Sequence, residues 1–170
     1  ARALIRALPD FPHCNARYDD EQELLFQHSA VHLGVATMTP QGLMVPVLRD
    51  AQALNIWQSA ALIRELAEKA RNGRCSPAEL SGSTITLTSL GALGGVVSTP
   101  VINAPETAII GVNKMQQRPV IRDGHIVPRL MMNLSASFDH RIVDGFDGAQ
   151  LVQALRKRLE HPALLNCMPY

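Results

Sequence analysis

The sequence predicts an α/β (α+β) domain in which helices cover a mixed β-sheet, and three observations support this fold class. Short stretches of alternating or continuous apolar residues, typical of strands, recur along the chain. Stretches of helical periodicity lie before, between and after them. The chain has 170 residues, of which 46% are hydrophobic, and it shows no internal repeat or low-complexity linker. We therefore expect one domain over residues 1–170 with a substantial core.

Composition and charge exclude several classes of protein. The 16 lysines and arginines nearly balance 15 acidic residues and form no long run, which argues against nucleic-acid binding. No stretch approaches the roughly 20 apolar residues that span a bilayer, so we expect no membrane partner. Cys14, Cys75 and Cys167 are widely spaced, which favours reduced thiols in an intracellular compartment over disulfides or a zinc site. A small-molecule or protein-borne substrate is the remaining expectation.

Local patterns predict the first elements. Residues 1–8 have the periodicity of an amphipathic helix that Pro9 ends. Because no capping residue precedes this helix, we expect the chain to be a piece of a longer protein. Two β-rich runs at 31–36 and 43–47 flank a segment of turn composition at 39–42, which predicts a hairpin.

Two capping boxes predict helix starts in the middle of the chain. Asn55 and Gln58 begin a stretch of helical apolar spacing that continues to residue 70, and Gly73 can end it in the left-handed conformation. Residues 76–79 repeat the capping pattern, with proline at the first helical position, which predicts one short turn.

The remainder of the chain is rich in predicted strands. Residues 84–88 alternate with a period of two, and the apolar run 108–112 is typical of a buried strand. An Asp-Gly pair within 119–127 predicts a hairpin with a type I′ turn. Residues 131–138 are expected to form a strand that ends just before His140.

Two further segments complete the prediction. The glycine-rich run 91–95 is typical of a loop and lacks the spacing of a phosphate-binding motif. After Gly145, apolar residues at helical spacing predict a closing helix that ends before His161 and Pro162.

His140 and Asp144 are the residues from which we expect catalysis. The unperturbed pKa of histidine lies near neutrality, so a positioned imidazole can take a proton from a thiol or hydroxyl and return it. The same pair can be purely structural, because ion-pair networks often mimic catalytic sites. A metal would need a third ligand and an unbroken helix, and Gly145 argues against the latter, so no metal is expected. The residues alone leave the catalytic and the structural interpretation open.

A wider resemblance favours the catalytic interpretation. Residues 139–145, Asp-His-Arg-Ile-Val-Asp-Gly, resemble the active-site signature of the dihydrolipoamide acyltransferases, the core components of 2-oxo acid dehydrogenase complexes. The resemblance extends through further ordered segments at 11–16, 33–47, 66–73, 86–91 and 100–106. It implies the fold of chloramphenicol acetyltransferase.

The resemblance also implies a chemistry. Members of the family pass an acyl group between the dithiol of a lipoyl arm and the thiol of coenzyme A, through a tetrahedral intermediate and without an acyl-enzyme. His140 would be the general base, and the hydroxyl of Thr88 would stabilise the oxyanion, with Ser89 as the alternative donor. Asp144 would orient His140, for example by holding an arginine such as Arg141, although its position also permits a helix cap.

Substrate and partners follow from the same resemblance. Residues 83–100 look most like the branched-chain members, which carry isobutyryl and related groups, but acetyl- and succinyl-transferring members share the catalytic residues. The site would lie between the subunits of a homotrimer, with the base of one chain facing the hydroxyl of its neighbour, and trimers would assemble into a larger core. Further partners would be a lipoyl domain, a 2-oxo acid decarboxylase and dihydrolipoyl dehydrogenase, in the bacterial cytoplasm or the mitochondrial matrix.

Some parts of such an enzyme are expected to lie outside this chain. They are the lipoyl domain, the peripheral-subunit-binding domain and the first part of the catalytic domain, and the residues that contact coenzyme A are not predicted. Two other functions stay open: a non-catalytic scaffold built from the same core, and a free-standing acyltransferase that acts on a small alcohol.

Overall fold

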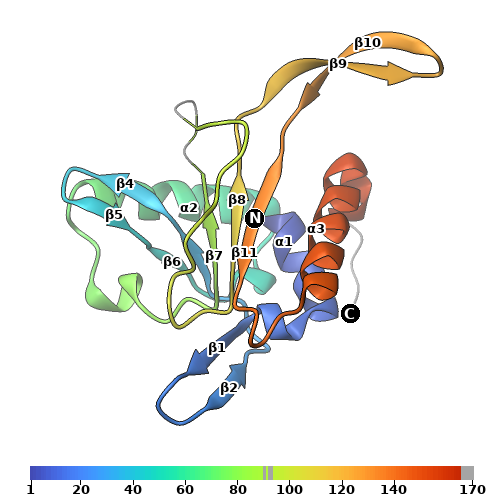
Figure 1. Cartoon of the computed structure of the whole chain (residues 1–170). Coiled ribbons are helices and arrows are strands. Elements are labelled where there is room, and N and C mark those ends of the chain that lie inside the picture. The colour runs from blue at the N-terminus through green and yellow to red at the C-terminus, as the bar shows by residue number, and fades with distance from the viewer. Residues whose placement is uncertain (90, 92–93, 166–170) are drawn as a thin grey trace.

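A five-stranded mixed sheet organises the residues that the computed structural model describes, which are 1–89, 91 and 94–165 (Figure 1). The strand order is β11-β8-β7-β3-β6. Their bounds are Leu134–Phe138 for β11, Ala108–Val112 for β8, Ile85–Thr88 for β7, Leu33–Val35 for β3 and Val47–Leu48 for β6. The central strands β8, β7 and β3 are parallel, whereas β11 and β6 pair antiparallel at the two edges. The mixed sheet predicted from the sequence is confirmed.

Helices cover one face of this sheet. The helix α1 spans Arg2–Ala7, α2 spans Ile56–Arg71 and α3 spans Gly145–Glu160. The capping box at the start of α2 is present with both of its hydrogen bonds, and Gly73 beyond its end has a φ of +65°. A short 3-10 turn at Leu8–Asp10 continues α1. Another at Pro77–Leu80 forms the predicted single turn. The three helices predicted at residues 1–8, from Asn55 to residue 70 and after Gly145, and the single turn predicted at 76–79, all depended on local signals and are confirmed.

Three two-stranded ribbons extend from the sheet. They are β1 (Ala16–Asp19) with β2 (Leu24–Gln27), β4 (Thr37–Thr39) with β5 (Gly42–Met44), and β9 (Gln116–Arg122) with β10 (His125–Met131). The β9–β10 ribbon projects from the body of the molecule (Figure 1). Asp123 and Gly124 both have positive φ at its tip, which confirms the predicted turn.

The strand predicted over residues 131–138 is divided, which corrects the sequence analysis. Met131 ends β10, and β11 begins only at Leu134. Between them the Asn133 carbonyl accepts hydrogen bonds from the backbone and side-chain amides of Asn113, and its own amide donates to Val96. These contacts turn the chain from its pairing with β9 to its pairing with β8, and no local pattern encodes such a change of partner.

The two faces of the sheet differ in chemistry because side chains alternate along each strand. The face under the helices is apolar; it carries Leu33, Ile85 and Ile110 and packs against Leu4, Leu66 and Leu151 of the helices. The opposite face is hydroxyl-rich and carries Thr86, Thr88, Ser135 and Ser137. Residues 94–106 run in front of that face and cover it (Figure 1).

Some sequence predictions concern residues outside the description. Leu90, Ala92 and Leu93 of the glycine-rich loop and Cys167 are among them. Cys14 and Cys75 are free thiols. No helix within residues 1–89, 91 and 94–165 combines the length and the apolar character that crossing a bilayer requires.

Gly34 of β3 is a point where the hydroxyl-rich face tolerates no side chain. A Cβ at this position would lie 2.6 Å from Thr86 Oγ1 and 2.8 Å from Val45 Cγ1. We expect Gly34→Ala to lower the free energy of unfolding by about 1–3 kcal/mol, because it overpacks a buried site. The control is Gly145→Ala at the start of α3, where an added Cβ meets nothing within 4 Å. Urea unfolding in which both variants change stability equally would contradict this prediction.

Candidate active site

His140 lies on a tight turn between β11 and α3. The backbone amide of Asp139 donates to the Thr107 carbonyl, and the amides of Ile142 and Val143 both donate to the Asp139 carbonyl. Val143 is fully buried and anchors the turn to the core, whereas His140 is exposed at its crest. Within the described part of the chain, no hydrogen bond reaches the imidazole. The turn therefore fixes the backbone of His140 and leaves its ring free to meet another group.

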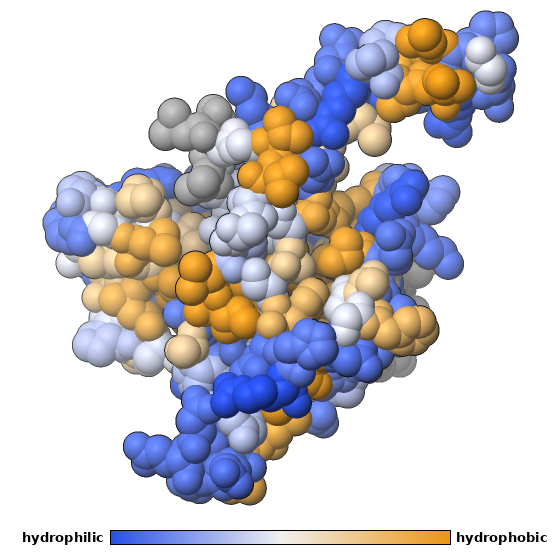
Figure 2. All heavy atoms as spheres, in the orientation of Figure 1, coloured by the Kyte–Doolittle hydropathy of each residue, from blue (hydrophilic) through white to orange (hydrophobic). Residues whose placement is uncertain are grey.

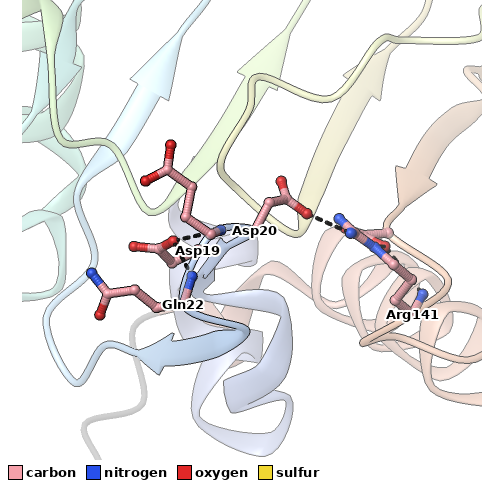
Figure 3. A network of polar contacts seen from close by, with 6 residues as sticks. Asp19, Asp20, Gln22 and Arg141 are labelled. Atoms are coloured by element: carbon pink, nitrogen blue, oxygen red, sulfur yellow. Dashed lines mark hydrogen bonds and ion pairs between the residues drawn. The ribbon is translucent and has the colours of Figure 1, made fainter.

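Arg141 ties this turn to the β1–β2 ribbon. Its guanidinium donates to both oxygens of Asp139 at 2.6–3.2 Å and to Asp20 Oδ1 at 2.5 Å, and it lies 4.6 Å above the Tyr18 ring. Figure 3 shows Asp20 directed at Arg141, while Asp19 accepts hydrogen bonds from its own turn. The guanidinium holds the pKa of Asp139 below its usual range. The ion pairs of Arg141 therefore go to Asp139 and Asp20.

Asp144 caps α3. Its side chain accepts a hydrogen bond of 2.8 Å from the amide of Asp147, and its carbonyl accepts from Gly148. A carboxylate here satisfies one of the free amides of the first helical turn and lies favourably against the helix dipole. Two roles were considered for Asp144, and the structure shows the helix cap. The cap also fixes the end of the His140 turn.

Thr88 is the last residue of β7 and borders a small cavity. The cavity has a volume of about 160 Å³ and is lined by Thr88, Ser89, Gly94, Gly95, Ser98, Thr99, Pro100, Val112 and Asn113. The hydroxyl of the alternative donor, Ser89, accepts a hydrogen bond of 3.2 Å from the amide of Gly91 and so takes part in the turn after the strand. Thr88, which shares the hydroxyl-rich face with Thr86, is therefore better placed to act on a bound group.

His140 and Thr88 lie toward opposite ends of the sheet. The register pairs Phe138 with Ala108 at one end of β8, and pairs both Thr88 and Ser135 with Gly111 near the other end. Three residues of strand separate these levels, which is about 10 Å, and His140 lies two residues beyond Phe138. A base must come within about 3 Å of the proton it removes, so the two side chains of a single chain do not form one site.

The described residues offer no activated thiol as an alternative nucleophile. Cys14 is fully buried, and burial raises the pKa of its thiol to about 12, with Asp147 adding to the effect. Burial also raises the pKa of Cys75. A nucleophilic cysteine needs a lowered pKa, so these two thiols are structural. The same part of the chain holds no group of His, Cys, Asp and Glu arranged to bind a metal ion.

Glu106 forms a buried polar cluster that the sequence analysis missed. Its Oε1 accepts hydrogen bonds from the side chains of Ser83, Thr86 and Asn103, and its Oε2 has no partner although it is buried. Glu106 was recognised only as part of a family-like segment. The signal that could have marked it is an acidic residue two positions before a strand as apolar as β8, where an unpaired charge would be costly.

The fold is that of an acyltransferase of the chloramphenicol acetyltransferase type. A solved chloramphenicol acetyltransferase aligns over 92% of this chain and 73% of its own, with a TM-score of 0.50 at 15% identity, which shows the fold alone. The model of the family "2-oxoacid dehydrogenases acyltransferase (catalytic domain)" matches residues 1–167, so the chain belongs to this family.

Two curated relatives come from branched-chain complexes. Both are lipoamide acyltransferase components of the branched-chain alpha-keto acid dehydrogenase complex. The protein of Pseudomonas putida is 62% identical to this chain and that of Pseudomonas aeruginosa is 59% identical, each over 96% of this chain. The acetyltransferase component of the pyruvate dehydrogenase complex of Bacillus subtilis is 38% identical over the same share. The chain spans 37–39% of the length of these relatives.

Two solved structures share the fold closely. A probable dihydrolipoamide acetyltransferase from Listeria monocytogenes has a TM-score of 0.89 at 37% identity and covers 99% of this chain and 71% of its own. The Azotobacter vinelandii dihydrolipoamide acetyltransferase has the same TM-score and identity, over 98% and 70%. That structure belongs to a study of a serine, a histidine and an asparagine in its catalytic mechanism.

The Glu106 cluster makes stability depend on pH in a defined direction. Burial raises the pKa of Glu106, against the smaller opposing effects of its three donors and of Arg17. A carboxyl whose pKa is raised by folding stabilises the fold fully below its unfolded pKa of about 4.3, and this contribution is lost as the pH rises through the folded pKa. We therefore expect Glu106→Gln to gain stability relative to the parent as the pH rises, by up to about 1.4 kcal/mol per pH unit within that window. Urea unfolding at a series of pH values measures this, and a difference independent of pH would contradict it.

Proposed function

We propose that this chain carries the catalytic residues of a lipoamide acyltransferase that moves a branched-chain acyl group, such as isobutyryl, between a dihydrolipoyl arm and coenzyme A. Membership of the family supports acyl transfer. The chain is about 60% identical to two branched-chain relatives but only 38% identical to an acetyltransferase, and this difference supports a branched-chain acyl group as the substrate.

The spacing of Thr88, His140 and Asp144 along the chain is the observation that carries the proposal. In the Azotobacter vinelandii enzyme, the serine studied lies as many residues before the histidine as Thr88 lies before His140. The asparagine lies as many residues after that histidine as Asp144 lies after His140. Threonine retains the hydroxyl of serine, and aspartate and asparagine both offer an oxygen that caps a helix. Both differences therefore retain the groups that these hydrogen bonds would need.

The chemistry needs one base and one oxyanion donor. His140 removes the proton of the attacking thiol, whose reference pKa of about 8.5 is only about two units above that of imidazole. The thiolate attacks the thioester carbonyl, and the negative charge moves to the carbonyl oxygen, where the Thr88 hydroxyl donates a hydrogen bond. The intermediate collapses, the original carbon–sulfur bond breaks, and the protonated His140 returns its proton to the departing thiolate. No acyl-enzyme is needed, which agrees with the structural character of Cys14 and Cys75.

The cavity beside Thr88 fits only the reacting end of a substrate. At about 160 Å³ it is well below the roughly 300–1,000 Å³ of pockets that enclose a whole ligand. Its size suits a short acyl chain with the adjoining thioester. Ser98, Thr99 and Asn113 add polar atoms to a wall that Pro100 and Val112 make partly apolar. The nucleotide part of coenzyme A would lie outside this cavity.

The site forms between copies of the chain. Because His140 and Thr88 lie at opposite ends of one sheet, the His140 end of one copy must face the Thr88 end of another. Such a contact joins two different surfaces, and it closes into a ring when repeated about an axis, as in a homotrimer. Exposed apolar residues near the Thr88 end support a covered surface; they include Val97 and, on the β9–β10 ribbon, Ile121, Ile126 and Leu130. This ribbon, at the upper right of Figure 2, carries hydrophobic surface.

The remaining partners follow from the same function. Trimers would assemble further into a multienzyme core that receives acyl groups from a lipoyl domain loaded by a 2-oxo acid decarboxylase. Dihydrolipoyl dehydrogenase would reoxidise that arm. Because the curated relatives reported above are bacterial, the proposed location is the bacterial cytoplasm.

Complementation tests the division of the site between chains. We expect His140→Ala to abolish transfer, and Thr88→Val to lower kcat by about 100-fold or more because it removes the oxyanion donor. When the two variants are co-assembled in equal amounts, about one interface in four pairs an intact His140 with an intact Thr88, and activity should return to that extent. The measurement is acyl transfer to dihydrolipoamide by the mixed assembly. Failure to recover any activity would contradict a site shared between chains.

The choice of acyl group is tested by a comparison of donors. Additional methyl groups that fill an apolar pocket change kcat/KM by about 10- to 200-fold, so isobutyryl-coenzyme A should exceed acetyl-coenzyme A by at least about tenfold. An assay with dihydrolipoamide as acceptor measures this ratio, and a small alcohol as acceptor is the control for an acyltransferase of the chloramphenicol type. Preference for acetyl would reassign the complex, and absence of transfer from either donor would favour a scaffold.

A further inference from the structure

We infer that Glu106 is a positioning residue for the Thr88 hydroxyl, acting through Thr86 on the same strand. The inference rests on the proposed function, in which Thr88 is the oxyanion donor. Glu106 itself is buried and lies at the end of the segment that covers the hydroxyl-rich face of the sheet. It touches no reacting atom in this scheme.

The Glu106 carboxyl joins two stretches of chain that are distant in the sequence. The Thr86 hydroxyl in the middle of β7 donates to Oε1 at 2.9 Å, and the Ser83 hydroxyl just before β7 donates to the same oxygen. The Asn103 amide, on the covering segment, donates to it at 2.9 Å. Only 3% of Glu106 is exposed, and a buried hydrogen bond to a carboxyl is stronger than one in water. One oxygen atom therefore holds both the strand and the segment above it.

Both walls of the Thr88 cavity depend on these contacts. Thr86 and Thr88 are two residues apart, so their side chains share one face of β7. The covering segment contributes Ser98, Thr99 and Pro100 to the cavity. It is fixed to β11 by the bonds from the Ser98 amide to Ser135 Oγ and from Ser137 Oγ to the Pro100 carbonyl. Near its other end, the bond from Thr86 of β7 to Glu106 ties it to that strand.

The surroundings of Thr86 leave its hydroxyl little freedom. Thr86 is fully buried, and the closeness of Gly34 on β3 leaves no space on that side. The charged group that faces Glu106 is Arg17 of β1, which pairs with it through an isolated β-bridge. A shift of about 1 Å in a catalytic group can lower a rate by about 100-fold, so loss of the Glu106 contacts should be measurable in kcat.

The experiment compares kcat and KM of the assembled acyltransferase with isobutyryl-coenzyme A and dihydrolipoamide. We expect Glu106→Ala and Thr86→Val to lower kcat by about 10- to 100-fold while KM for the acyl donor changes less than about twofold. Thr86→Ser, which keeps the hydroxyl, should restore most of the rate. Thr84→Val is the matched control, because it removes a buried hydroxyl just before the same strand, and that hydroxyl bonds to Asn15 and His32 rather than to Glu106.

A double-mutant cycle separates positioning from general destabilisation. If Glu106 acts through Thr88, Glu106→Ala should change kcat less than about twofold in a Thr88→Val background. The inference would be overturned if Glu106→Ala lowered kcat as much in the Thr88→Val background as in the parent. Equal losses of kcat in Thr84→Val and Glu106→Ala would overturn it too. If Glu106→Ala does not fold, Thr86→Val in both backgrounds decides the question. An inactive parent enzyme would instead refute the proposed function, whereas an active parent with normal kcat in all these variants would refute only the role of Glu106.

Discussion

The pairing of β8 with β7 on one side and with β11 on the other is the constraint on which the rest of the structure depends. This register places the end of β11 beside the start of β8, and the end of β7 beside its far half. The turn that presents His140 and the cavity beside Thr88 consequently belong to opposite ends of the sheet. A slip of one residue would also exchange the two faces and place the hydroxyls of β7 against the helices. The same hydrogen bonds therefore determine the core and the polar face, and they underlie the proposal that a second copy completes the site.

The polar face explains how an irregular segment can be held firmly. Burying a hydroxyl or a carboxyl without a partner costs several kcal/mol in a nonpolar environment, so the covering segment must supply partners as well as bulk. Residues 94–106 do this with backbone groups at Ser98 and Pro100 and with the side chains of Asn103 and Glu106. The bonds of Ser98, Pro100 and Glu106 end on side chains of β11 and β7. The polar face thus does for this segment what apolar packing does for the helices.

The sequence could predict the features that are encoded locally. The capping boxes at Asn55 and Ser76, the Asp-Gly turn at the tip of the β9–β10 ribbon and the limits of α3 all depend on residues within a few positions of one another. It could not predict the strand order, the division of the chain at Asn133 or the separation of His140 from Thr88, because these depend on partners 20 or more residues away. Asp144 shows the same division, since its cap is a local property whereas any orienting role depends on what His140 meets. The Glu106 cluster combines side chains from two stretches of chain that lie 20 or more residues apart along the chain, from Thr86 and Ser83 to Glu106, and so escapes any local pattern.

Under the proposed function, the exposure of His140 to water provides a chemical reason for the assembly of several copies. An imidazole surrounded by water can transfer protons to water, and a thioester that reached it there could be hydrolysed instead of being passed to a thiol. Enclosing the reacting groups excludes that competing reaction and strengthens the hydrogen bond to the oxyanion. In the proposed site, one chain holds its base and its oxyanion donor apart, so neither would act before the other copy arrives. The division of the site would then protect the acyl group from water until both thiols can be bound in an enclosed channel.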